Sequence, residues 1–147
     1  EDYVDAINSY DEAAKAKDLP NDRTANVLLN RGSAYLKIRK FMEALQDMNA
    51  CLEAQPDIEI AYFRKGVIYF EMEEFESAKA AFAHGMKLRQ EQQKNRETAP
   101  YARYIRKCNA EIADEEGTIA AAVPANAPAA PVAAPAAAAR QAHLLLE

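Results

Sequence analysis

The chain has 147 residues and carries 18 Lys and Arg against 23 Asp and Glu, which gives a formal net charge of −5. This balance argues against a nucleic-acid binder, because phosphates are bound by a basic face. The sequence has no run of about 20 strongly apolar residues and no basic N-terminal region, which argues against a membrane span and a secretory signal. Two cysteines, Cys51 and Cys108, are too few for a disulfide scaffold, so we expect two buried thiols in the cytoplasm or nucleus.

The predicted elements up to residue 116 are all helices. Strand-forming β-branched runs are missing there, and Ala, Glu, Lys, Leu and Met are common. The first predicted helix covers residues 3–16, where Tyr3, Ile7 and Tyr10 recur at helical spacing. The helices that follow it repeat a common sequence pattern.

A period of 34 residues relates the next two pairs of helices. Shifting the chain by 34 aligns small residues with small ones and large apolar residues with large ones, namely Gly32 with Gly66, Tyr35 with Tyr69, Leu36 with Phe70, Phe41 with Phe75 and Ala44 with Ala78. Small residues allow two helices to approach closely, and aromatic residues fill the remaining space. The pattern resembles the tetratricopeptide repeat (TPR), a helical hairpin that stacks into a solenoid. The resemblance predicts an all-α TPR solenoid of about three repeats.

The same shift makes residues 3–16 the second helix of an earlier, partial repeat. Its first helix is missing, which implies either an N-terminal truncation or an incomplete record of the chain. The inner face of Tyr3, Ile7 and Tyr10 then lacks a partner helix, so a second copy of the chain in a homodimer is one expected partner.

Two local features extend the repeat pattern. Asp57 follows Pro56 and is expected to cap the next helix at its N-terminus. Gly85 lies in the middle of a helix, where glycine costs up to about 1 kcal/mol relative to alanine, so it should mark a tight contact with the following helix. The polar stretch 89–97 is either an extension of that helix or a loop.

A capping helix and a linker should complete the chain. An apolar stripe of helical spacing follows Pro100 and consists of Tyr101, Ile105, Cys108 and Ile112. This helix would close the apolar end of the solenoid, so residues 1–116 form the predicted repeat domain. Of the charged residues only Arg140 and Glu147 lie after it. Residues 117–147 are rich in Ala and Pro and are expected to be a disordered linker.

Nothing in the sequence suggests a catalytic centre. His84 is expected on the outer side of a helix and His143 lies in the linker, so no histidine is placed to activate a serine. Phosphate-binding loops and paired metal ligands are absent from the sequence. The acidic run Glu71 to Glu76 is expected to be solvated surface. We therefore predict no enzyme activity, no cofactor and no metal site.

Function is expected in the concave groove, which the first helix of each repeat lines. The candidate binding residues at these positions are Asn30, Lys37, Ile60, Phe63, Arg64 and Val67. Apolar residues such as Phe63 and Val67 on a helix face are more often core residues than ligand contacts. Arg64 and Asn30 are the stronger candidates, because a guanidinium and an amide suit a carboxylate or a peptide backbone.

Three stretches carry a narrower resemblance, namely Ala61 to Gly66, Phe75 to Gly85 and Ile105 to Ala113. Together with the Ala/Pro-rich linker, they are similar to the repeat domain of the Sgt co-chaperone family, the suppressors of G-two allele of Skp. The resemblance implies an adaptor without turnover of its own. A missing downstream domain would dock on heat shock protein 90, and the repeat domain would serve Skp-type ubiquitin-ligase subunits, kinetochore assembly or immune receptors.

The alternative is a carboxylate-clamp co-chaperone, which grips the acidic C-terminal peptide of heat shock proteins. Asn30 and Arg64 match the pattern of such clamps. Ile60 occupies the position of a clamp lysine, and the first helix of the partial repeat cannot be compared. The loss of one cation could remove about 1.5–3 kcal/mol of charged hydrogen bonding, so the clamp ranks second.

Overall fold

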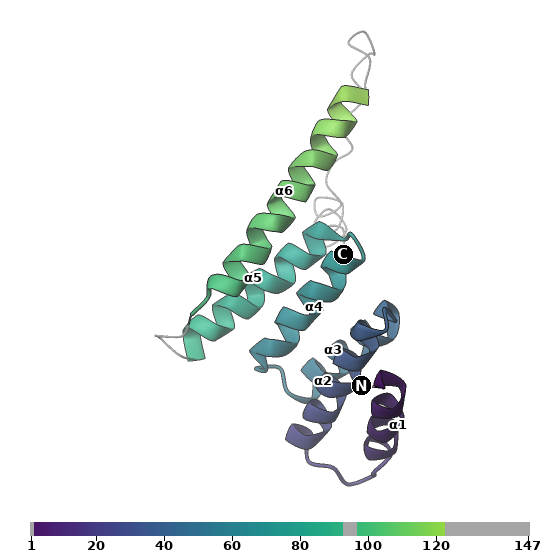
Figure 1. Ribbon diagram of the computed structural model, residues 1–147. Coiled ribbons are helices and arrows are strands. Elements are labelled where there is room, and N and C mark those ends of the chain that lie inside the picture. The colour runs from purple at the N-terminus through teal and green to yellow at the C-terminus, as the bar shows by residue number, and fades with distance from the viewer. Residues whose placement is uncertain (1, 93–96, 123–147) are drawn as a thin grey trace, which may run out of the picture. The chain divides into compact units, whose positions relative to one another are not determined.

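The computed structural model describes residues 2–92 and 97–122, and it contains six helices and no strand within these ranges (Figure 1). The predicted all-α architecture is confirmed. In chain order the helices are α1 (Tyr3–Ala14), α2 (Asn21–Lys37), α3 (Phe41–Ala54), α4 (Glu59–Glu71), α5 (Phe75–Gln92) and α6 (Ala99–Ala122). None of the described helices is long and apolar enough to cross a bilayer.

Helices α2 and α3 form one antiparallel hairpin, and α4 and α5 form the next, as Figure 1 shows. Each hairpin turns through a residue in the left-handed conformation, Arg39 with φ 61° and Glu73 with φ 62°. These residues lie 34 positions apart, and in both turns the next amide N–H donates to the carbonyl five residues back at 2.9 Å. The sequence period is therefore repeated in the backbone geometry of the helix ends.

Glycines allow the paired helices to approach closely, as the sequence pattern predicts. A Cβ atom added at Gly66 would lie 2.7 Å from the ring of Phe82, and one added at Gly32 would lie 2.6 Å from the terminal methyl of Met48. One added at Gly85 would lie 2.8 Å from the ring of Tyr101. The expected contact between Gly85 and the capping helix is confirmed.

The buried side chains form two clusters. The first lies among α2, α3 and α4 and contains Ala25, Ala44, Met48, Cys51, Ala61 and Ile68. The second joins α5 to α6 and contains Ala78, Phe82, Tyr101 and Cys108. Both thiols are buried and unpaired, as predicted, and burial raises the pKa of Cys51 to about 11 and also raises the pKa of Cys108.

Helix α6 is held at its start by contacts with α4 and α5. Tyr101 is fully buried, and its hydroxyl donates to the carboxylate of Glu59 at the start of α4. Arg89 of α5 lies 3.6 Å from the same carboxylate, and its guanidinium carbon lies 5.7 Å from the Tyr101 ring centre. Burial, and then the hydrogen bond to Glu59, raise the pKa of the Tyr101 hydroxyl. The predicted capping helix is thus tied to the last repeat.

Two local expectations differ from the structure. Asp57 does not cap α4, because Ile58 occupies the N-cap position without a side-chain hydrogen bond. The backbone carbonyl of Asp57 accepts a hydrogen bond from Gln92 at 2.7 Å instead, across the antiparallel pair. Helix α6 also continues past Gly117 to Ala122, since a glycine alone costs only about 1 kcal/mol in a helix. The remainder of the predicted linker, residues 123–147, lies outside the described residues.

Candidate partner-binding groove

A hollow of about 330 Å³ lies among α1, α2 and α4. Its lining comes from one face of each helix and consists of Asp2, Tyr3, Ala6, Tyr10, Asn30, Ser33, Ala34, Lys37 and Arg64. On α2, Asn30, Ser33 and Lys37 are three, four and seven residues apart, a spacing that brings side chains onto one helical face. We call this hollow the α1–α2–α4 groove.

The groove combines cations with polar groups that can bind a ligand. Lys37 and Arg64 bring positive charge, and Asp2 is the one carboxylate in the lining. The Nε atom of Arg64 is buried and has no hydrogen-bond partner among the described residues. Ser33 uses its hydroxyl proton internally, donating to the carbonyl of Leu29 at 2.6 Å. The groove therefore offers an amide and two cations to an anionic partner.

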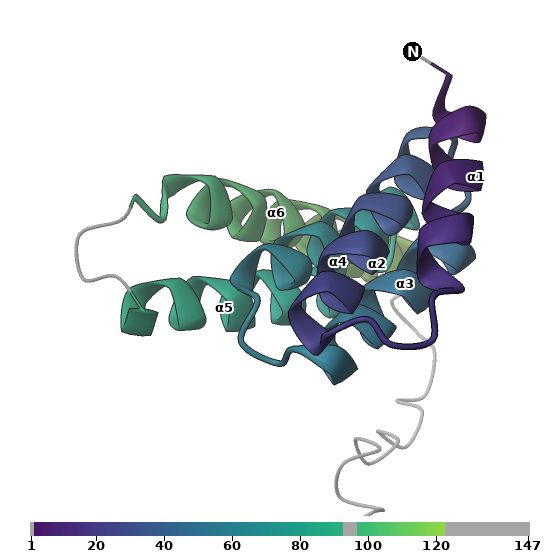
Figure 2. The same cartoon turned by 90° about the horizontal axis from the view of Figure 1, so that it is seen from below.

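Helix α1 is fixed against the groove by a guanidinium that bridges three helices. Arg31 of α2 donates to both carboxylate oxygens of Asp47 on α3, at 2.6 and 2.8 Å. It also donates to Asp11 on α1 at 2.9 Å. Hydrogen bonding to Asp47 is the main cause that holds the pKa of Arg31 above its usual range. As Figure 2 shows, α1 runs beside α2, and this bridge holds its groove-lining face in place.

The structure brings together three of the six candidate residues, Asn30, Lys37 and Arg64, in the groove. Ile60, one turn before Arg64 on α4, is half-buried and does not line it. Phe63 and Val67 pack instead against the cluster that joins α5 to α6.

Phe63 is surrounded by aromatic rings. Its ring makes edge-to-face contacts with Phe82, Tyr101 and Tyr104, with centroids 5.4, 5.0 and 5.5 Å away. Such contacts are typical of a core residue. Its counterpart 34 residues earlier, Leu29, also packs against a core cluster, so this repeat position is core in both hairpins.

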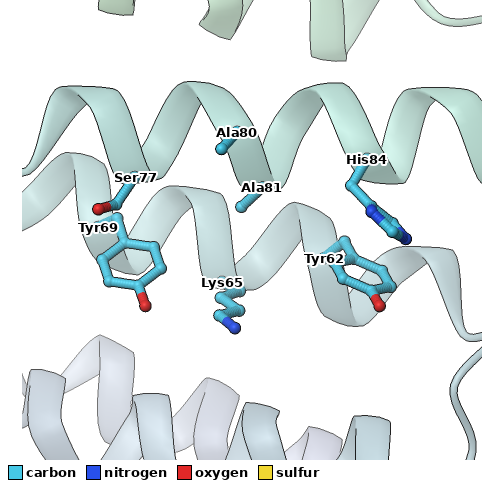
Figure 3. Close-up of a pocket in the computed structure, with 7 residues that line it drawn as sticks. All are labelled: Tyr62, Lys65, Tyr69, Ser77, Ala80, Ala81 and His84. Carbon is cyan, nitrogen blue, oxygen red and sulfur yellow. The ribbon is translucent and has the colours of Figure 1, made fainter. Parts of the chain in front are cut away.

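A second hollow of about 320 Å³ lies on another face of the α4–α5 pair (Figure 3). The rings of Tyr62 and His84 stack across its end with centroids 4.2 Å apart, and Lys65 and Tyr69 project beside it. Ser77, Ala80 and Ala81 of α5 complete its lining. Since Lys65 follows Arg64 directly but lines this separate hollow, it is a natural control for the groove.

Comparison with known proteins identifies the repeating unit. The sequence model of the tetratricopeptide repeat family matches residues 25–58 and 60–92. Each match spans one helical hairpin, α2 with α3 and α4 with α5. Residues 25–92 form two tetratricopeptide repeats.

The relatives of this repeat domain include an Hsp70-Hsp90 organizing protein and an SGT1 homolog. The chain is 35% identical to the wheat (Triticum aestivum) Hsp70-Hsp90 organizing protein over 85 residues, which are 58% of this chain and 14% of the relative. It is 29% identical to a rice (Oryza sativa subsp. japonica) SGT1 homolog over 115 residues, 78% of this chain and 29% of that protein. The chain thus spans less than a third of these relatives.

A solved structure shares the TPR arrangement. The first TPR of Spaghetti (RPAP3), bound to the HSP90 peptide SRMEEVD, superimposes with a TM-score of 0.64 at 26% identity, covering 76% of this chain and 80% of that one. The TPR solenoid predicted from the 34-residue period is confirmed by these comparisons and by the helical hairpins.

The repeat pattern alone did not identify the α1 side of the groove. Tyr3, Ala6 and Tyr10 line it with Asp2, although the sequence indicated only that this face lacks a partner helix. Their spacing of three, four and seven residues was the available signal. What the sequence could not supply was the distance between this face and the cations of α2 and α4.

Proposed function

We propose that this chain is the non-catalytic, protein-binding part of a co-chaperone, and that the α1–α2–α4 groove docks a protein partner. The observation that carries the proposal is that Lys37, Arg64 and the amide of Asn30 line one hollow. A guanidinium can bind a carboxylate through two parallel hydrogen bonds. The names of the wheat relative and the Spaghetti complex support a chaperone context.

The similarity to the rice SGT1 homolog supports a narrower form of the proposal. In this form, a domain beyond the present sequence contacts heat shock protein 90, and the groove serves a Skp-type ubiquitin-ligase subunit, kinetochore assembly or immune receptors. The chain itself turns over no substrate and needs no cofactor. Such an adaptor would act in the cytoplasm or the nucleus.

A carboxylate clamp is the second candidate. The position of Asn30 and Arg64 in one hollow favours it, because these residues match the clamp pattern. Ile60 counts against it, since it supplies no charge where a clamp has lysine. The adaptor therefore remains the first proposal.

Self-association belongs to the same proposal. Tyr3 and Val4 are neighbours on α1 and are 38% and 53% exposed. We expect a second copy to cover Val4, which does not line the groove, and sedimentation should show a dimer that Val4→Asp dissociates. A monomer at all concentrations would contradict this part of the proposal.

Calorimetric titration of the full chain can separate the two candidates. A purified Skp-type subunit should bind, and Arg64→Ala should weaken it by about 1–3 kcal/mol if Arg64 is a central anchor. Lys65→Ala, which removes the adjacent cation from a different hollow, should leave the affinity unchanged. Micromolar binding of SRMEEVD but not of its C-terminal amide, abolished by Arg64→Ala and without binding of the Skp-type subunit, would instead establish the clamp.

A further inference from the structure

Building on the proposed docking role, we propose that the α1–α2–α4 groove binds an internal acidic segment of a partner protein rather than a free C-terminus. The occupant is an extended stretch of partner chain with two acidic side chains separated by one residue. Lys37 and Arg64 are the two cations that bind them. The charge complementarity between these cations and the acidic side chains is the basis of the assignment.

The first argument is the position of the cations in the repeat. Arg64 lies 34 residues after Asn30 and so occupies the same level of the next repeat. Lys37 lies seven residues beyond Asn30 on α2, which corresponds to about 10 Å along the helix axis. Because Lys37 and Arg64 enter the hollow at different heights along the helices, they are suited to bind two carboxylates that are separated from each other.

The second argument concerns the geometry of the ligand. In an extended chain, alternate side chains point to the same side and are about 7 Å apart. Lys37 and Arg64 are offset along the helix axes, and their long side chains are flexible enough to meet two carboxylates at this spacing. A C-terminal acidic residue instead carries both its carboxylates on one residue, and binding them needs cations close together. Ile60, one turn from Arg64 on α4, supplies no such second cation.

The third argument is the lining on the α1 side. Tyr3 and Tyr10 line the same hollow as the cations, and their hydroxyls are able to donate to backbone carbonyls of an extended segment. Asp2 caps α1 through a 3.0 Å hydrogen bond from the Val4 amide, and its charge opposes an incoming carboxylate. Asp2→Asn should keep the cap, because Asn is an equally good N-cap residue, while it removes the repulsion.

The experiment uses the full chain and a peptide blocked at both ends, acetyl-GSEVEGS-amide, with acetyl-GSQVQGS-amide as the uncharged control. NMR titration should show binding of the acidic peptide only, with shifts at residues of the groove. Lys37→Ala and Arg64→Ala should each weaken it about tenfold or more, the value of a charged hydrogen bond. Lys65→Ala should have no effect, and Asp2→Asn should tighten binding several-fold.

SRMEEVD and its C-terminal amide provide the decisive comparison, because they differ only at the terminus. Equal affinity of the two forms for the unmodified chain is expected, whereas Ile60→Lys should make the free-acid form bind more tightly. A tenfold preference of the unmodified chain for the free acid would overturn the inference, as would a Lys37→Ala variant that binds the blocked acidic peptide normally. If a folded partner still binds through Arg64 in either case, the docking role survives and only the ligand assignment fails.

Discussion

The guanidinium of Arg31 contacts a buried carboxylate and an exposed one. The same substitution at each carboxylate therefore tests how burial affects the stability that the ion pair contributes. Asp47 is only 4% exposed and makes two hydrogen bonds with Arg31, whereas the Asp11 side chain is 38% exposed and makes one. Asp47→Asn replaces an acceptor oxygen with an amide that faces a guanidinium N–H donor. A lost charged hydrogen bond in a buried site costs about 1.5–3 kcal/mol, and breaking a buried pair outright costs about 3–5 kcal/mol. We therefore expect Asp47→Asn to cost about 2–4 kcal/mol.

The same substitution at Asp11 should cost much less. An exposed ion pair contributes about 0.2–1 kcal/mol, because water screens the charge and the side chains lose entropy. Urea unfolding of the full chain followed by circular dichroism at neutral pH would measure both variants, with an unchanged dependence on urea concentration as the control for two-state behaviour. If the two variants lose stability equally within about 0.5 kcal/mol, burial of Asp47 does not govern the energetics of this bridge and the reasoning is refuted.

Three further changes test the packing, the turns and the thiols. Gly66→Ala should destabilise the fold by about 1–2 kcal/mol, because the added methyl is forced against Phe82. Gly117→Ala should be neutral or stabilising, because a methyl added there meets nothing within 4 Å. Equal melting temperatures of the two variants would contradict this reasoning. Glu73→Gly should stabilise by about 0.5–1 kcal/mol in urea unfolding, since glycine adopts a positive φ without strain, and a loss of stability would contradict it. Burial raises the pKa of Cys51 from 9.0 to about 11, so its contribution to stability is complete below pH 9 and is lost as the pH rises to 11. Cys51→Ala should flatten the stability profile in that range, and an unchanged slope would show that Cys51 does not titrate there.

Much of the fold followed from the sequence because helical period and repeat period are local or one-dimensional properties. The matched positions of Gly32 and Gly66 indicated where helices touch, and Cys108 on its apolar stripe indicated the capping helix. These inferences needed no distances, since a 34-residue shift carries the same packing from one hairpin to the next. The misplaced cap at Asp57 shows the limit, because a hydrogen bond from Gln92, 35 residues away, engages its backbone.

The binding groove depended on tertiary structure. The sequence placed Asn30, Lys37, Phe63 and Arg64 at concave positions of the repeats, and it could not tell which of them face a partner. Packing of α6 placed the Phe63 ring among Tyr101 and Tyr104 and left Arg64 in the groove. The spacing of a repeat specifies which side of a helix a residue occupies, whereas the neighbouring helix, which lies far along the chain, decides whether that side is core or surface.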